Sequence, residues 1–384
     1  MAFTEQQPKL RLLIVSVGSL VGQNILDSLE FPAFSRRHLV FVAGTNSLVM
    51  TANNFRCDEC FLVPPTASPD YPERMSEVLR EVRPDLVLCG RDADTAAMCR
   101  LMRADSSLPG KLPYGTLESV LTALDKWRTL LFCRKHGLPF ADSFVMGRSG
   151  DLDALRAFTD KVGFPLIAKP VEGFRSTGVV FVRNWDETIS VSEREGYMFQ
   201  EFLGAPDALE DYFRSLDGPV PLFTEAPDVN THNAFVAISS DGDISDVLVL
   251  YVHYNFGVST LFRRVVHPEL EGLTRSFAEA LLSEGGYGPL QVQFRQDRQG
   301  QQKAFEMNLR TTGGTNAHLF MGHDELGFIV NDLLPEREFP VVNLPPADDL
   351  VVTKSPTAYT VEGAAAATLT EFGRWRADPR TEVD

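Results

Sequence analysis

Short apolar runs alternate with amphipathic stretches along the first third of the chain. Each run has the length of a buried strand, and the stretches between them repeat apolar residues at helical spacing. This alternation is typical of βαβ units and predicts a parallel sheet flanked by helices. The expected strands are residues 10–17, 39–43, 60–63 and 85–89, and the expected helices include residues 23–29 and 74–82.

The second half carries more closely spaced strand patterns, several joined by hairpin-like turns such as residues 240–243. This pattern predicts an α+β region with antiparallel sheets. A passage rich in proline, glycine and serine at residues 106–113 predicts a domain boundary, and the proline-rich chain beyond 340 predicts a tail or small appendage. The expected strands are residues 165–169, 179–182, 197–203, 234–238, 247–254, 289–295 and 303–308.

One helix has both of its ends marked in the sequence. Asp125 can cap a helix over residues 126–136, and Gly137 with the nearby Pro139 ends it. Lys126 then stands in the first helical turn, where the helix dipole opposes a cation. Either this lysine is merely solvated, or its ammonium serves something outside the helix.

Composition restricts the partners. The 384 residues include 52 acidic and 36 basic side chains, and the formal charge of −16 argues against nucleic acid and anionic membranes. No run approaches the roughly 18 apolar residues of a membrane span, and the N-terminus lacks the pattern of a signal peptide, so we expect a cytoplasmic protein. Cys57 and Cys60 form a single C-x-x-C, for which we expect inert buried thiols.

The turn after the first strand resembles a dinucleotide fingerprint only superficially. Gly18 and Gly22 are separated by three residues, so G-x-G-x-x-G is not met. The second strand ends in Gly44, Thr45 and Asn46, without an acidic residue to hold a ribose hydroxyl. A structural turn or a substrate-facing loop is therefore favoured over a nicotinamide site.

Two segments of the second half offer groups for phosphate. Residues 165–170 form an apolar strand that delivers Lys169 at its end, and Pro170 keeps that lysine in an extended conformation. Apolar strands rarely carry a lysine inward unless an anion meets it. The glycine-bounded loop at residues 172–178, which includes Arg175, can wrap phosphate oxygens or can be a simple hairpin turn.

Two further segments offer a base platform and oxygen ligands. Residues 197–204 form an apolar strand that can hold a planar base while its backbone pairs with the ring edge. On residues 304–310, alternation puts Glu306, Asn308 and Arg310 on one face, and strand pairing can bring Gln293 beside them. Such a set suits Mg²⁺ held between protein and polyphosphate, whereas ordinary surface alternation is the alternative.

In this order, the segments resemble the ATP-grasp superfamily, specifically its carbamoyl-phosphate-synthetase-like branch. The resemblance rests on residues 125–126, 167–170, 177–179, 200–203, 292–294 and 306–310, although the family often has Asn-Pro-Arg where this chain has Asn308, Leu309 and Arg310. It implies an α/β and α+β fold. A Rossmann-like pre-ATP-grasp domain (1–112) would precede a two-lobed ATP-grasp fold, with a small lobe (113–196), a large lobe holding the metal site (197–340) and a C-terminal tail or appendage (341–384).

The resemblance also implies residue roles. Lysines and the glycine loop would contact ATP phosphates, backbone groups of the strand at 200–203 would hold the adenine, and Asp207 or Glu210 is the candidate for the ribose. The implied ATP-binding residues are Lys126, Lys169, Gly173, Arg175, Ser176, Thr177, Gly178, Gln200, Glu201, Phe202, Leu203 and Asp207. The implied ligands of Mg²⁺ or Mn²⁺ are Gln293, Glu306 and Asn308, and Arg310 would steady the transferring phosphoryl group.

The implied activity is an ATP-dependent carboxylate–amine ligase that joins small molecules through an acyl phosphate, with a homodimer as one expected assembly. Loading of an amino acid onto a carrier protein, or an ATP-binding regulator without ligase activity, are the alternatives. At the substrate end, one interpretation places a substrate carboxylate beside Arg264 and Ser259 near the acyl phosphate. Phosphate contacts or surface salt bridges are the other interpretations of these residues.

Overall fold

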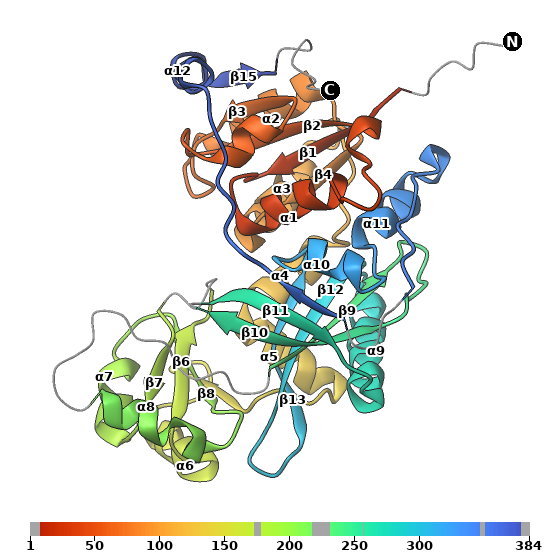
Figure 1. Cartoon of the computed structure of the whole chain (residues 1–384). Coiled ribbons are helices and arrows are strands. Elements are labelled where there is room, and N and C mark those ends of the chain that lie inside the picture. Colours follow the sequence, from red (N-terminus) through yellow and green to blue (C-terminus); the bar gives the residue numbers. More distant parts are fainter. Residues whose placement is uncertain (1–7, 173–177, 217–230, 256, 346–349, 378–384) are drawn as a thin grey trace, which may run out of the picture.

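Three β-sheets organise the chain (Figure 1). The computed structural model describes residues 8–172, 178–216, 231–255, 257–345 and 350–377. One sheet lies in the N-terminal region, and the other two belong to the small and large lobes of the remaining chain. This arrangement confirms the predicted combination of an α/β region with an α+β region.

The N-terminal sheet has four parallel strands in the order β3-β2-β1-β4, as the alternating pattern predicts. A fifth strand, β15, comes from the end of the chain and pairs antiparallel with β3. The strands are β1 (Leu10–Val15), β2 (Val40–Asn46), β3 (Glu59–Leu62), β4 (Leu86–Cys89) and β15 (Arg374–Arg376). The helices are α1 (Leu20–Leu29), η1 (Arg37–Leu39), η2 (Ala52–Arg56), α2 (Tyr71–Val82) and α3 (Asp92–Ala104).

Helices from distant parts of the chain cover one face of this sheet. Ile25 of α1 and Ile329 of α11 (Glu325–Leu333) share a buried apolar cluster with side chains of β1, β2 and β4. A fully buried ion pair fastens the same junction, because the Arg36 guanidinium meets the Asp324 carboxylate at 2.5 Å. The N-terminal sheet is therefore fixed to the later chain by a shared core.

The small lobe is a four-stranded antiparallel sheet in the order β5-β8-β6-β7. Its strands are β5 (Ser143–Val145), β6 (Leu166–Pro170), β7 (Val180–Val182) and β8 (Tyr197–Glu201). The helices of this part are α6 (Leu152–Val162), α7 (Trp185–Ser192), η3 (Pro206–Leu209) and α8 (Glu210–Ser215).

Two helices, α4 (Leu117–Leu124) and α5 (Lys126–His136), precede the small lobe. The predicted ends of α5 are confirmed. The Asp125 carboxylate accepts hydrogen bonds from the backbone N–H groups of Trp127 and Arg128, and Gly137 adopts a left-handed φ of 65°.

The large lobe is built on a six-stranded antiparallel sheet in the order β13-β12-β9-β10-β11-β14. Its strands are β9 (His232–Ile238), β10 (Leu248–Asn255), β11 (Val258–Arg264), β12 (Gly288–Gln296), β13 (Gln302–Leu309) and β14 (Val351–Thr353). The helices, besides α11, are α9 (Pro268–Ser283), α10 (Thr315–Phe320) and η4 (Pro335–Arg337).

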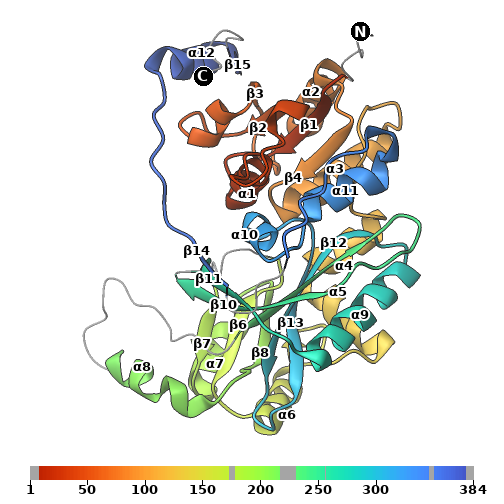
Figure 2. The same cartoon turned by 45° about the vertical axis from the view of Figure 1, so that its right-hand side comes forward.

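The C-terminal segment joins two of the sheets. After β14 the chain runs along the outside of the molecule to α12 (Gly363–Phe372) and then to β15 (Figure 2). The sequence predicted a tail or appendage from 341 onward, but strand pairing at both ends makes this segment part of the large-lobe sheet and of the N-terminal sheet. The sequence did not reveal this pairing, because the chain is proline-rich here and each of the two pairing strands is only three residues long.

Two further observations concern the described part of the chain as a whole. Among the residues that the structure describes, no helix has the length and apolar character needed to cross a bilayer. All five cysteines are buried, and burial raises the pKa of Cys57 to about 12 and that of Cys60 well above its ordinary value. The C-x-x-C thiols are buried, as expected.

Candidate functional site

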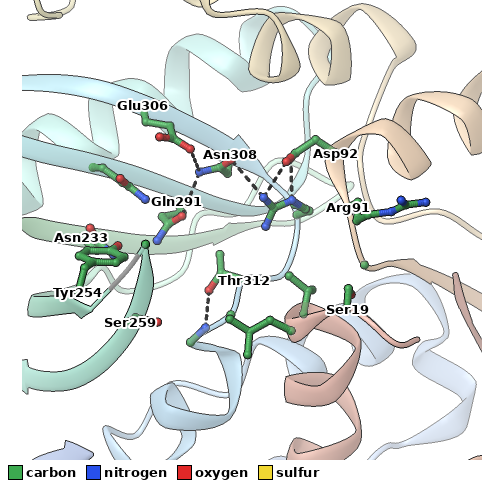
Figure 3. A pocket seen from close by; sticks show the side chains of 18 of the residues that line it. Ser19, Arg91, Asp92, Asn233, Tyr254, Ser259, Gln291, Glu306, Asn308 and Thr312 are labelled. Carbon is green, nitrogen blue, oxygen red and sulfur yellow. Dashed lines mark hydrogen bonds and ion pairs between the residues drawn. The ribbon is translucent and has the colours of Figure 1, made fainter. Parts of the chain in front are cut away.

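A cavity of about 510 Å³ lies where the N-terminal sheet meets the large-lobe sheet (Figure 3). One wall consists of the turns at the carboxyl ends of β1, β2 and β4, where parallel sheets of this type place their ligands. That wall includes Gly18, Ser19, Asn46, Gly90, Arg91 and Asp92. The turn at Gly18 therefore faces the cavity, as the substrate-facing alternative proposed.

The opposite wall is a polar row on β12 and β13. Strand pairing sets Gln293 opposite Glu306 and Gln291 opposite Asn308, which confirms the predicted neighbourhood of Gln293 and Glu306. All four side chains line the cavity. The amide nitrogen of Asn308 donates to Gln291 Oε1 at 3.1 Å and to Glu306 Oε1 at 3.3 Å.

The donor chemistry of this row suits a hard cation. Glu306 offers a carboxylate, and Gln293 and Asn308 offer amide oxygens, all of which are ligand types that Mg²⁺ prefers. In the described part of the chain, no group of three or more His, Cys, Asp or Glu side chains is arranged to hold a metal. The set therefore fits a magnesium ion that completes its coordination with phosphate oxygens and water, rather than an ion caged by protein alone.

Arg310 extends the row toward the N-terminal sheet. Its guanidinium donates twice to the Asp92 carboxylate, from Nε at 2.6 Å and from Nη2 at 2.7 Å, and Nη2 also lies 3.4 Å from Asn308 Oδ1 (Figure 3). Burial would lower the pKa of Arg310, but the Asp92 carboxylate outweighs it and the pKa rises. The cation stays charged beside the polar row.

Asp92 is a site residue that the sequence reasoning missed. It stands in the first turn of α3, directly after the loop that follows β4. An acidic residue in the first turn of a helix has an ordinary explanation in the helix dipole, so it gave no separate signal. Its partner lies 218 positions away, and only the fold brings the two together.

Lys169 is buried between the lobes. Its ammonium donates to Gln200 Oε1 at 2.8 Å within the small lobe and to the Phe305 carbonyl oxygen of β13 at 3.2 Å. Burial lowers the pKa of Lys169 to about 7, whereas the Glu306 carboxylate acts in the opposite direction. An anionic ligand near this ammonium would stabilise its charged form.

Lys126 lies behind the polar row. It lines a small void of about 10 Å³ together with Asp92, Glu306 and Asn308. Its Nζ also lies 3.4 Å from the carbonyl oxygen of Val171, which follows β6. The structure thus brings Lys126 close to Glu306 and Asn308, the residues that the resemblance assigns to the metal.

The predicted adenine-contacting segment lies in the small lobe and does not line the cavity of about 510 Å³. The Glu201 carboxylate accepts hydrogen bonds from the Asp142 N–H at 2.6 Å and from Lys303 Nζ at 2.7 Å. Phe202 and Leu203 are buried, which leaves backbone groups as their means of contacting a base. The predicted adenine-contacting segment is therefore separate from this cavity.

The other predicted ATP-binding residues belong to the glycine-bounded loop and to η3. Gly173, Arg175, Ser176 and Thr177 lie outside the described residues. Gly178 has a φ of 77°, and a Cβ there would lie 2.8 Å from the Tyr197 hydroxyl, so glycine is required. Asp207 is exposed in η3 and does not line the cavity.

The two residues of β11 that were predicted to contact the substrate, Ser259 and Arg264, lie in different places. Ser259 lines the cavity, together with Tyr254 of β10 (Figure 3). Arg264 does not line it: its guanidinium reaches the Met321 carbonyl oxygen at 3.5 Å. At about 3.3 Å per residue, five positions of strand put some 16 Å between the two backbones. The structure thus does not support the pairing of Arg264 with Ser259 around one substrate.

A buried network supports the loop that follows Arg310. Thr315 Oγ1 accepts from the Thr312 N–H at 2.9 Å and donates to Glu325 Oε2 at 2.7 Å. Glu325 Oε1 in turn lies 2.6 Å from His318 Nδ1. Thr312 and Gly313 line the cavity, so this network fixes a wall of the site from behind.

Comparisons with known proteins agree with this architecture. The chain has the ATP-grasp fold. An N5-carboxyaminoimidazole ribonucleotide synthetase from Thermotoga maritima superposes with a TM-score of 0.58 at 15% identity, covering 88% of this chain and 78% of the other. The ADP complex of the synthetase from Staphylococcus aureus gives a TM-score of 0.63 at 10% identity, covering 89% and 82%.

Two other enzymes also resemble parts of the chain. The biotin carboxylase domain of the Hydrogenobacter thermophilus 2-oxoglutarate carboxylase, in complex with MgADP, superposes with a TM-score of 0.61 at 12% identity, covering 85% of this chain and 70% of that one. A D-alanine–D-alanine ligase from Chromohalobacter salexigens is 34% identical over 122 residues, which span 30% of this chain and 34% of that ligase. No protein-family model matches the chain.

Proposed function

We propose that this protein is an ATP-dependent carboxylate–amine ligase, which forms an amide or peptide bond between two small molecules through an acyl phosphate. One observation carries the proposal: Gln293, Glu306, Asn308 and Arg310 form a row on one wall of a cavity whose other wall is the ligand-binding edge of the N-terminal sheet. A regulator that only senses ATP has no need for a second ligand-sized space beside its phosphoryl-transfer residues. The partial likeness to a D-alanine–D-alanine ligase supports amino-acid-like substrates.

The chemistry activates a poor electrophile. A substrate carboxylate oxygen attacks the γ-phosphorus of ATP, the bond from that phosphorus to the β,γ-bridging oxygen breaks, and ADP leaves. The amine then attacks the acyl carbon, and the carbon–oxygen bond to phosphate breaks, releasing phosphate. An α-amine with a pKa of about 8 is partly neutral already, so a strong protein base is not required.

The residues of the row divide the work. Gln293, Glu306 and Asn308 would hold Mg²⁺, which neutralises charge on the transferring phosphoryl group. Arg310 adds a fixed positive charge beside the same group, and Asp92 orients its guanidinium. The substrate acid and amine would occupy the space between this row and the turn at Ser19.

Lys126 and Lys169 would contact ATP from the side of the small lobe. Both lysines lie near Glu306. Lys126 lines the small void together with Glu306, and the Glu306 carboxylate raises the pKa of Lys169 through its charge. Bound phosphates would keep Lys169 protonated at neutral pH. The backbone at Glu201 to Leu203 would hold the adenine, and the protein's charge of −16 does not prevent binding because these cations are concentrated at one place.

A substrate screen tests the proposal. Amino acids and other small acids are offered with ATP and Mg²⁺, and phosphate release is measured with and without an amine. Hydroxylamine traps an acyl phosphate as a hydroxamate, so a hydroxamate formed without added amine is the expected signature. ATP binding without turnover of any acid would instead support the regulator. Transfer only to a carrier protein would support the loading enzyme.

A further inference from the structure

The C-terminal segment places a half-buried lysine against two other parts of the molecule. Lys354 follows β14 directly, and its backbone N–H donates to the Thr260 carbonyl oxygen of β11 at 2.8 Å. Its ammonium donates to Asn24 Oδ1 of α1 at 2.7 Å and to the Gly313 carbonyl oxygen. One side chain therefore connects the C-terminal segment, the N-terminal domain and the loop after Arg310.

The contact at the Gly313 carbonyl acts on a loop that both lines the cavity and packs against α1. Gly313 lines the cavity, and a Cβ on it would lie 2.9 Å from Leu20 Cδ2, so the loop packs closely against the start of α1. Asn24 is fully buried on the same helix and donates to the Leu20 carbonyl oxygen at 2.8 Å. The ammonium thus fastens the loop to the helix across their contact.

We propose that Lys354 is a positioning residue, which holds the wall formed by residues 312–314 in the place that the substrates require. The proposal rests on the proposed function, because that function gives the cavity its substrates. The network of Thr315, Glu325 and His318 holds the same loop from the opposite side. The two supports come from different elements, so loss of Lys354 removes one of them and leaves the fold of the loop otherwise supported.

The charge of Lys354 makes the contact dependent on pH. Burial lowers the pKa of Lys354 to about 8, and the Asp27 carboxylate of α1 opposes that shift. The groups that the ammonium touches, Asn24, Gly313 and the Phe262 ring, are uncharged. Above about pH 8 the amine becomes neutral, and its hydrogen bonds lose the strength that charge gives them.

Hydrogen exchange in the full-length protein tests the contact without any assay of activity. Lys354→Met should speed exchange of the amides of Thr312, Gly314 and Thr315 roughly tenfold, the size expected when a charge-assisted hydrogen bond is lost. Lys354→Arg should keep most of the protection. Lys111→Met is the matched control, because Lys111 Nζ also donates to a backbone carbonyl, that of Leu333, but Leu333, unlike Gly313, does not line the cavity. Unchanged exchange in Lys354→Met would overturn the proposal.

Kinetics of an accepted substrate pair test the positioning role. Lys354→Met should raise the KM for the acid or the amine about tenfold while the affinity for ADP stays the same. In the unmodified protein that KM should rise above about pH 8, whereas Lys354→Arg should show no such rise.

The pH series keeps the test valid if Lys354→Met fails to fold. A pH-independent KM in both proteins, or an unchanged KM in Lys354→Met, would overturn the role. Absence of all turnover would count against the proposed function, and the exchange result alone would then decide on Lys354.

Discussion

The carboxylate of Asp92 accepts two hydrogen bonds from the guanidinium of Arg310 in a bidentate ion pair, from Nε at 2.6 Å and from Nη2 at 2.7 Å. Asp92 belongs to α3 of the N-terminal domain, and Arg310 follows β13 of the large lobe. The pair therefore sets the position of Arg310, the cation proposed to stabilise the phosphoryl group, relative to the cavity wall that the N-terminal domain contributes. A bidentate pair fixes orientation as well as charge, which a lysine could not do.

Asp92→Asn keeps the size of the side chain and removes its charge. We expect kcat to fall roughly 10- to 100-fold, because Arg310 loses the partner that orients it beside the transferring phosphoryl group. Affinity for ADP should change little. Asp105→Asn is the control, since Asp105 pairs with Arg80 at the surface. Steady-state kinetics check the expectation, and an unchanged kcat in Asp92→Asn would contradict it.

Glu306→Gln leaves an oxygen ligand but removes the only carboxylate among the three proposed metal ligands. We expect Mg²⁺-dependent ADP formation to fall by more than about 100-fold, while the melting temperature stays close to that of the unmodified protein. Glu284→Gln provides the comparison, because Glu284 pairs with Lys135 and His136 far from the row. Near-normal ADP formation in Glu306→Gln would refute the metal assignment.

Lys169 should make nucleotide binding dependent on pH. Its pKa of about 7 means that the free protein loses this charge as the pH rises through neutrality, whereas bound phosphates favour the protonated form. ADP binding should therefore take up a proton above about pH 7, and affinity should fall by up to about tenfold per pH unit there. Calorimetry in buffers of different ionisation enthalpy measures the uptake. Lys169→Arg should bind without it, and equal proton uptake by the two proteins would count against this account.

His323 should contribute to the loss of stability in acid. Burial lowers the pKa of His323 to about 4, from an ordinary value of 6.5. Between these values the unfolded chain binds the extra proton and the folded protein does not, so stability falls as the pH drops from about 6.5 to about 4. We expect His323→Gln to lose on the order of 2 kcal/mol of this dependence. Urea unfolding at several pH values measures it, with His38→Gln at an exposed site as control. An identical pH dependence in His323→Gln would disprove the assignment.

Local sequence patterns predicted much of the fold and part of the candidate site. The apolar runs at β1, β2 and β4 predicted a parallel sheet because hydrophobic periodicity survives in any tertiary context. Asp125 and Gly137 predicted the ends of α5 because capping is a local interaction. Alternation along β13 put Glu306, Asn308 and Arg310 on one face, and the register with β12 placed Gln293 beside Glu306.

Local sequence patterns could not predict the contacts between residues that are distant in the sequence. Nothing local marks Asp92 as the partner of Arg310, or Lys354 as the support of Gly313, because each contact joins segments that meet only after the sheets have packed. Arg264 illustrates the opposite error: an arginine close in sequence to Ser259 lies at the far end of β11 and turns to Met321.

By itself, the sequence determined the periodicities, the helix ends and the ordered series of polar residues that resembles ATP-grasp ligases, because each depends on neighbours within a few residues. The tertiary structure decided which of those residues share a cavity, which cations have carboxylate partners, and that the C-terminal segment completes two sheets. Those outcomes depend on packing between elements hundreds of positions apart, and side-chain patterns within one segment hold no record of it.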